Sequence, residues 1–263
     1  MTLIDPASTA GRAAELLRLH TDPELLVLVN VWDVASARVV AAGPGCRALA
    51  TASHSIAATL GYRDGEHIPV DLMIDMVGRI VAAVDVPVTA DLEAGYGDAG
   101  ETVRRAIAVG VVGANIEDQM KPLPDAVAAV TAVVAAGAAE GVPFVLNART
   151  DAFIRAADRD PAAVLADAIE RGRAFLDAGA SCVFVPGALD EPTVEALVAG
   201  IGERKVSVIG GPGRIPPDRL AGLGVARLSY GPWSQRAVLT RLAELAQDLH
   251  ACGGFPEGVQ VLN

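Results

Sequence analysis

The sequence predicts an α/β protein that folds as a single-domain (β/α)8 barrel. Eight short apolar segments alternate along the chain with Ala-rich stretches of helical periodicity, and glycine or proline bounds most of the apolar segments. Segments that are apolar on both faces are typical of parallel strands covered by helices. A length of 263 residues suits one barrel, since such domains run to about 250 residues.

The order of the elements supports this prediction. Each strand is followed by a helix, and Asp160-Pro161 and Asp190-Glu191-Pro192 look like helix starts with an acidic cap and an early proline. The predicted strands cover 25–31, 48–53, 86–92, 113–118, 144–149, 182–186, 206–211 and 226–231. The predicted helices cover 34–42, 70–83, 99–109, 124–139, 161–178, 191–201, 216–222 and 233–249.

No linker divides the chain, so residues 1–263 are predicted to form one domain. Within it, residues 1–24 form a helical extension, with a helix near 8–20 that closes the bottom or edge of the barrel. The last helix is expected to end near residue 250.

Composition narrows the class of partner. The formal net charge is −11 and no Lys/Arg run occurs, which disfavours nucleic acid. No apolar run is long enough to cross a membrane and the N-terminal residues do not resemble a secretion signal. The three cysteines are far apart and lack a Cys-x-x-Cys spacing, which disfavours a disulfide framework or a zinc site. We therefore expect a cytoplasmic protein that acts on a small molecule.

Polar side chains follow three predicted strands with a period of two, which places each set on one face. Several carboxylates at one end of an apolar barrel need a compensating cation, and hard oxygen ligands select Mg²⁺ or Mn²⁺. Salt-bridged loop residues are the alternative explanation. The three sets are Thr89, Asp91 and Glu93; Asn115 and Glu117; and Asn147, Arg149 and Asp151.

Two glycine-rich segments could approach a ligand. Gly95-Tyr96-Gly97 directly follows the first carboxylate pair, and Gly210-Gly211-Pro212-Gly213 follows the seventh strand, where barrels often bind phosphate. Either segment could equally be an ordinary turn, and for the second segment the turn is favoured.

At these same residues the sequence resembles the isocitrate lyase/phosphoenolpyruvate mutase superfamily. The matching stretches occur in family order over about residues 25–240, and together they are highly specific. They are NVWDVASAR (30–38), TASHSIAATLGYRDGE (51–66), TADLEAGYGD (89–98), GANIEDQ (113–119), NARTDAF (147–153), VFVPGA (183–188) and GGPG (210–213).

The resemblance implies an Mg²⁺-dependent enzyme that forms or cleaves a C–C or P–C bond beside a pyruvate-like carboxylate. It also implies a homotetramer in which the last helix, 233–250, packs on a neighbouring subunit. By the resemblance, Asp91, Glu93 and Glu117 bind the metal, often through water. Arg149 and the Ser53-His54 segment bind the substrate, and Asp64 lies near metal and substrate.

Further residues are assigned to the same site with an alternative beside each. Trp32, Gly95, Tyr96 and Asn147 are candidate substrate contacts, although Trp32 could equally be packing. His54 is a candidate proton donor, or a hydrogen-bonded structural residue. Asp151 is expected to orient Arg149 rather than to bind metal.

The residues that differ from the family pattern disfavour some of the activities found in the family. Isocitrate and methylisocitrate lyases carry a Lys-Lys-Cys-Gly-His loop, whereas residues 119–127 read QMKPLPDAV, with neither cysteine nor histidine. These two activities are therefore not expected. Glu93 stands where the mutase branch has aspartate, and Pro186 where some members have histidine.

The resulting hypothesis is a carbon–carbon lyase or decarboxylase that acts on a small 2-oxo or 2-hydroxy carboxylate through a pyruvate enolate. Either loop 119–127 or the segment around Asp64 is expected to close over the site. With no loop cysteine, a water molecule, Tyr96 or His54 must supply the proton. A phosphonopyruvate-type P–C hydrolase or mutase and a non-catalytic keto-acid binding protein are the alternatives.

Overall fold

Parallel strands arranged around a closed ring form the centre of the molecule. A computed structural model describes residues 6–262, and its strands follow the order β1-β9-β8-β7-β6-β5-β4-β3-β2. The first barrel strand is split into two segments by Val29, and these segments pair with β9 and β3 respectively, which closes the ring. The strands are β1 (Leu26–Leu28), β2 (Asn30–Val31), β3 (Leu49–Thr51), β4 (Val88–Asp91), β5 (Gly113–Glu117), β6 (Val145–Arg149), β7 (Cys182–Phe184), β8 (Val206–Ile209) and β9 (Arg227–Ser229). The predicted barrel is confirmed.

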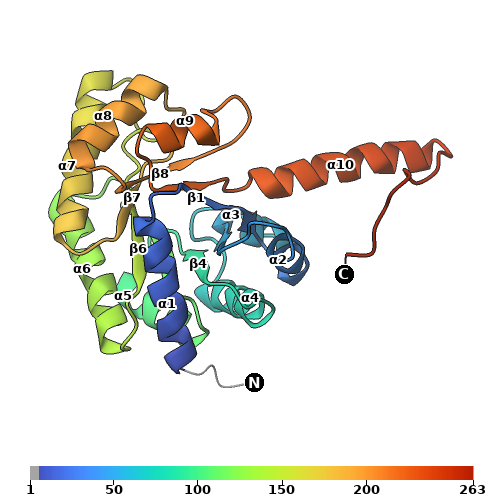
Figure 1. Ribbon diagram of the computed structural model, residues 1–263, viewed down its shortest axis with the longest axis horizontal. Helices are drawn as coiled ribbons and strands as arrows, with labels where there is room; N and C mark the ends of the chain where they lie inside the picture. Colours follow the sequence, from blue (N-terminus) through green and yellow to red (C-terminus); the bar gives the residue numbers. More distant parts are fainter. Residues whose placement is uncertain (1–5, 263) are drawn as a thin grey trace.

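Helices cover the outside of this ring (Figure 1), and the helices predicted from the sequence are present within one or two residues of the expected bounds. One further helix, α3, was not predicted: it has seven residues and follows β3 almost directly. The helices are α1 (Pro6–Thr21), α2 (Val34–Ala41), α3 (Ser53–Thr59), α4 (Val70–Ala82), α5 (Ala99–Ala108), α6 (Leu123–Ala139), α7 (Pro161–Asp177), α8 (Glu191–Ile201), α9 (Pro217–Gly222) and α10 (Trp233–His250).

Local sequence explains where several helices begin. Asp160 accepts a hydrogen bond from the main-chain N–H of Ala163 at 3.1 Å, and Asp190 accepts one from Thr193 at 3.0 Å. Each carboxylate satisfies a main-chain N–H that has no partner within the first helical turn. Both acidic helix starts predicted from the sequence are confirmed.

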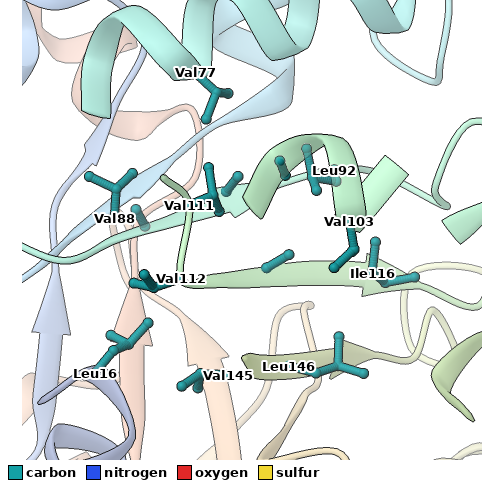
Figure 2. Close-up of a cluster of buried hydrophobic side chains, with 14 of the residues drawn as sticks. Leu16, Val77, Val88, Leu92, Val103, Val111, Val112, Ile116, Val145 and Leu146 are labelled. Carbon is teal, nitrogen blue, oxygen red and sulfur yellow. The ribbon is translucent and has the colours of Figure 1, made fainter. Parts of the chain in front are cut away.

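The hydrophobic core lies mainly between the strands and the surrounding helices. Figure 2 shows part of it, where Val88 and Ile116 of the sheet region lie near Val77 of α4 and Val103 of α5. This arrangement explains why the strands are apolar on their outer faces as well.

Helix α1 packs against the lower end of the barrel. Its Leu16 is fully buried and lies near Val145, at the start of β6 (Figure 2). A Cβ atom on Gly113 would lie 2.8 Å from Leu16 Cδ2 and 2.7 Å from the Val145 oxygen, so the close approach of α1 requires glycine here. The predicted N-terminal helix therefore closes the end opposite the carboxyl ends of the strands, and residues 1–5 lie outside the described part.

The barrel interior contains a polar layer made of Asn115, Asn147, Ser207 and Arg227. Asn147 Nδ2 donates to Asn115 Oδ1 at 2.9 Å and to Ser207 Oγ at 3.3 Å. Arg227 is fully buried and donates from Nη2 to Asn115 Oδ1 at 3.2 Å. Burial lowers the pKa of Arg227 to about 10, so this guanidinium still carries its charge at neutral pH.

Helix α10 leaves the barrel and projects away from it (Figure 1). Its first turn is anchored, because Ser234 Oγ donates to the Asn30 oxygen at 2.6 Å and Gln235 Nε2 donates to the Ser55 oxygen at 3.1 Å. Further along the helix, Leu242 is 57% exposed. No helix within residues 6–262 has the length and apolar character needed to cross a bilayer.

Candidate active site

Three neighbouring strands end in ionisable side chains. Strands β4, β5 and β6 finish at Asp91, Glu117 and Arg149, and Glu117 lies directly opposite Arg149 in the strand register. Two further predicted residues, Glu93 and Asp151, lie just beyond the strand ends. The carboxyl ends of barrel strands are where βα loops build active sites, so the predicted location is supported by the register.

Arg149 is held between two carboxylates. Its Nη1 lies 2.8 Å from Glu117 Oε2, and its Nε donates to Asp151 Oδ1 at 2.8 Å. Asp151 is almost completely buried, with 1% of its side chain exposed, whereas 20% of the Arg149 side chain is exposed. The expectation that Asp151 orients Arg149 agrees with this geometry, because a carboxylate fixes a guanidinium through its directional N–H groups.

Burial dominates the electrostatics of Glu117. Desolvation raises the pKa of this carboxyl to about 7, although the neighbouring Arg149 guanidinium acts in the opposite direction. Burial also opposes the charge of Arg149, but Glu117 and Asp151 outweigh it and raise the Arg149 pKa. Arg149 therefore remains a fixed cation beside carboxylates that are costly to ionise without further positive charge.

Asp91 is tied to the start of α3. Its Oδ2 accepts hydrogen bonds from Ser53 Oγ at 2.7 Å and from Ser53 N at 3.2 Å. The resemblance assigns the main-chain N–H groups of the Ser53-His54 segment to the substrate. Here the Ser53 N–H and its hydroxyl are both directed at Asp91. The main-chain N–H of Asp91 donates to Thr51 Oγ1 at 3.0 Å, so the end of β4 is fixed against β3.

Glu93 is held by two segments at once. Its Oε2 accepts a hydrogen bond from the main-chain N–H of Glu66, and its Oε1 accepts one from Tyr96 Oη at 3.1 Å. Glu66 also accepts a hydrogen bond from the Tyr96 main-chain N–H at 2.5 Å. All three residues have positive φ, between 53° and 62°, and a non-glycine residue in this region is strained.

The pKa of Glu93 is raised to about 7, first by burial and then by the nearby charge of Asp91. Burial and the Glu93 charge also raise the pKa of Tyr96, so its hydroxyl stays protonated at neutral pH. Glu93 and Tyr96 are therefore joined by a hydrogen bond whose proton belongs to the phenol.

His54 and Asp64 form a separate pair on more exposed positions. His54 Nδ1 lies 3.4 Å from Asp64 Oδ2, with 41% and 52% of the two side chains exposed. The pair connects the first turn of α3 with the α3–α4 connection. The structure thus brings together the two residues that the resemblance places near the substrate.

The other predicted contact residues have clear packing partners. Trp32 is partly buried against the core, and Asn147 belongs to the fully buried polar layer, where its amide nitrogen already has two acceptors. A Cβ atom on Gly95, which has φ +90°, would lie 2.5 Å from Ala99 Cα. Glycine is therefore required by the turn that leads into α5.

The second glycine-rich segment is also explained by packing. A Cβ atom on Gly210 would lie 2.7 Å from the Tyr230 ring, and one on Gly211 would lie 2.7 Å from the Trp233 indole nitrogen. These close approaches account for both glycines without a bound phosphate, which supports the interpretation of this segment as a structural turn.

Two ionisable residues near the site were not predicted. Asp118 and Arg171 form a buried ion pair at 3.1 Å, with 2% and 10% of their side chains exposed. Arg171 lies in the buried stripe of α7 together with Val164, Ala168 and Phe175. A charged residue at a position of helical apolar periodicity was the signal in the sequence.

The carboxylates match the ligand chemistry of a hard divalent cation, although they do not converge. Mg²⁺ prefers oxygen ligands, and these are offered by Asp91, Glu93 and Glu117. Burial of their negative charges costs free energy, which a bound cation would offset. Within the described residues, however, no three His, Cys, Asp or Glu side chains come together as a metal-holding group. The chemistry of these side chains fits a hard cation, whereas their positions do not by themselves define a metal site.

Segment 119–127, one of the two segments expected to close over the site, includes the start of α6. Helix α6 begins at Leu123, one residue before the predicted start, so residues 118–122 connect it to β5. Gln119 and Met120 have φ values of 49° and 56°, which makes this connection a tight turn. Closure of this segment, or of the segment around Asp64, over the site stays a prediction.

Comparisons with known proteins agree with the fold. A sequence profile of the phosphoenolpyruvate phosphomutase family matches residues 16–250. An uncharacterized protein of Mycobacterium tuberculosis is 32% identical over 243 residues, covering 92% of this chain and 91% of the relative. The phosphoenolpyruvate phosphomutase of Streptomyces hygroscopicus is 26% identical over 270 residues, covering 95% and 84% of the two chains.

Solved structures give the same result. A Burkholderia cenocepacia J2315 protein, provisionally named a phosphonomutase, superposes with a TM-score of 0.85 at 37% identity, covering 91% of this chain and 98% of the other. An oxaloacetate acetylhydrolase in complex with its product oxalate superposes with a TM-score of 0.84 at 25% identity, covering 95% and 90%. The chain therefore belongs to the phosphoenolpyruvate phosphomutase family of the isocitrate lyase/phosphoenolpyruvate mutase superfamily, whose members are lyases and mutases.

Proposed function

We propose that this protein is a Mg²⁺- or Mn²⁺-dependent carbon–carbon lyase or decarboxylase that cleaves a small 2-oxo or 2-hydroxy carboxylate. The observation that carries the proposal is Arg149, a guanidinium held by Glu117 and Asp151 beside the other carboxylates at the strand ends. Such a cation can bind the carboxylate of a substrate and stabilise negative charge that develops next to it. The similarity to an oxaloacetate acetylhydrolase supports a substrate with a pyruvate-like end.

Bond cleavage in such a substrate leaves an electron pair that must be accepted. When the C3–C4 bond of a 2-oxo acid such as oxaloacetate breaks, its electron pair forms a C2–C3 double bond and the carbonyl π pair passes to the C2 oxygen, which gives an enolate. The chemistry that Mg²⁺ supplies when bound by Asp91, Glu93 and Glu117 is stabilisation of this negative charge. Arg149 orients the adjacent carboxylate, because its donors are already fixed before the substrate arrives.

A proton must then reach the enolate carbon, and the chain has a candidate donor. His54 Nδ1 faces Asp64, so the other ring nitrogen, Nε2, is directed away from that carboxylate and can carry the transferable proton. Asp64 would stabilise the protonated imidazole. Tyr96 is a poorer donor, because its raised pKa makes loss of its proton costly.

The first experiment is a release assay over a panel of oxaloacetate, substituted malates and phosphonopyruvate, with Mg²⁺ and with EDTA. We expect metal-dependent release of pyruvate or another 2-oxo acid from one of them, lost in Asp91→Ala. The matched control is Asp71→Ala, since Asp71 lies on α4 with 83% of its side chain exposed. Release that persists in EDTA, or in Asp91→Ala, contradicts the proposal.

The alternative activity is hydrolysis or transfer at a P–C bond, which the match to the phosphomutase profile favours. Phosphate release from phosphonopyruvate would identify the hydrolase, and formation of phosphoenolpyruvate would identify the mutase. Saturable binding of a 2-oxo acid without turnover of any panel member would identify a binding protein instead.

The proposal includes a homotetramer in which α10 packs on a neighbouring subunit. Val238, Leu239 and Leu242 are between 51% and 57% exposed on a helix that projects from the barrel, and a row of exposed apolar residues favours a protein partner. Light scattering should give four times 26.9 kDa, and Leu242→Asp should lower this mass, whereas Arg241→Asp at an exposed charged position should not. A monomeric wild-type protein contradicts the tetramer.

The cytoplasmic location stays a prediction.

A further inference from the structure

A buried chain of ion pairs and hydrogen bonds connects α7, outside the barrel, with Arg149 in the site. It begins at Arg171, whose Nη1 donates to Asp118 Oδ2 at 3.1 Å, and it continues from Asp118 Oδ1, which accepts the main-chain N–H of Asp151 at 3.0 Å. Asp151 Oδ1 in turn accepts a hydrogen bond from Arg149 Nε at 2.8 Å. Each link is a directional contact between groups that have little or no access to solvent.

Asp118 is the centre of this chain. Its Oδ1 also accepts the main-chain N–H of Met120 at 2.9 Å, and its own main-chain N–H donates to the Arg149 oxygen at 3.0 Å. The Asp118 main chain therefore holds the Arg149 carbonyl, while its carboxylate holds the Asp151 main chain and the tight turn after β5. The hydrogen bond to Met120 helps to offset the strain of two consecutive residues with positive φ, Gln119 and Met120.

Arg171 fixes Asp118 from outside the barrel. Its Nη1 also donates to the Lys121 oxygen at 3.0 Å, and its Nε donates to Asp167 Oδ1 at 2.8 Å. An apolar side chain would fill this position in the buried stripe of α7 without the cost of burying a charge. A buried ion pair is poor evidence for added stability. The presence of this pair is better explained by the main-chain segments that it holds in place.

We propose that Asp118 and Arg171 are positioning residues for Arg149. They hold the Asp151 main chain, and thereby its carboxylate, at the point where it directs the Arg149 guanidinium toward the substrate carboxylate. The inference rests on the proposed function, because it assigns Arg149 to carboxylate binding. It adds two residues that do not contact the substrate.

The test uses oxalate as the probe, with the full-length protein in MgCl2 and calorimetry as the readout. Arg171→Met leaves the Asp118 carboxylate buried without its cation, and we expect oxalate affinity to fall ten- to a hundredfold, the range typical of residues that orient ligand-binding groups. The matched control is Arg155→Met, because Arg155 contacts the same Asp151 at 3.3 Å but is 53% exposed. This control should change the affinity less than threefold.

A second variant separates positioning from folding. Asp118→Asn added to Arg171→Met removes the unpaired buried charge but keeps an oxygen that can accept the Asp151 N–H. The double variant should therefore recover at least half of the loss in oxalate affinity, measured as the change in log Kd. Far-UV circular dichroism of every variant at the assay temperature shows whether the fold is intact.

The outcomes distinguish this inference from the proposed function. If wild-type protein binds no oxalate, or if Arg149→Met binds it as well as wild type, the proposed role of Arg149 and the inference are both overturned. If Arg149→Met loses binding while Arg171→Met retains wild-type affinity, the inference alone is overturned. An Arg171→Met loss that the double variant leaves unchanged, with the fold intact, also overturns it.

Discussion

His20 gives a prediction about stability that can be worked out from the structure. This residue lies on α1, is 2% exposed and has its Nδ1 2.8 Å from the Leu16 oxygen. Nδ1 must donate to that carbonyl, so Nε2 is unprotonated, and Nε2 is buried without a hydrogen-bond partner among the described residues. Burial, together with the nearby Arg227 charge, lowers the pKa of His20 from 6.5 to about 3.

The sign follows from the two protonation states. Below pH 6.5 the unfolded chain takes up a proton on His20 that the folded protein excludes, so stability is full above pH 6.5 and is lost as the pH falls toward 3. At pH 5, which is 1.5 units below the pKa of 6.5 for His20 in the unfolded chain, protonation lowers the free energy of the unfolded state. At 1.36 kcal/mol per unit this amounts to about 2 kcal/mol.

The assay is urea unfolding followed by tryptophan fluorescence at pH 7.5 and pH 5, at one protein concentration. His20→Phe removes the titrating group, so its loss of unfolding free energy between the two pH values should be about 2 kcal/mol smaller than that of wild type. His67→Gln, at an exposed position, serves as the control and should behave as wild type. Equal losses in wild type and His20→Phe would refute the reasoning.

Three further predictions concern packing, capping and reactivity. Gly113→Ala should destabilise the protein by about 1–3 kcal/mol, because its Cβ would lie 2.7 Å from a Val145 oxygen; an unchanged melting temperature would contradict this. Asp160→Ala removes the cap of α7 and should cost about 1 kcal/mol in urea unfolding, whereas Asp160→Asn should retain most of it. Exposed Cys252 should react with a thiol reagent in the native protein, whereas Cys182, fully buried and with its pKa raised to about 11 by burial, should react only on unfolding. Rapid native labelling of Cys182 would show that the interior is accessible.

The sequence was sufficient to predict the barrel and the location of the charged strand ends, because both depend on local periodicity. Asp91, Glu117 and Arg149 could be placed at the ends of neighbouring strands from the alternation of apolar and polar residues alone. The position of Glu93 was predicted, but its partner was not. Its contact with Glu66 bridges 27 positions and depends on the path of the α3–α4 connection.

Long-range pairing explains the other omissions. Asp118 and Arg171 are 53 positions apart, and neither residue has a sequence neighbour that indicates the pairing. The helix predicted over 124–139 is present and begins one residue earlier, at Leu123. Helix α3 was missed because it is too short to show a helical period.

The tight connection between β5 and α6 has a consequence for the kinetics of ligand entry. A segment of five residues, 118–122, whose turn is already fixed by Asp118 has little conformational freedom left to lose when a ligand arrives. Association at this edge of the barrel should therefore proceed in a single phase, without the slow isomerisation that follows docking when a long flap must fold over a ligand.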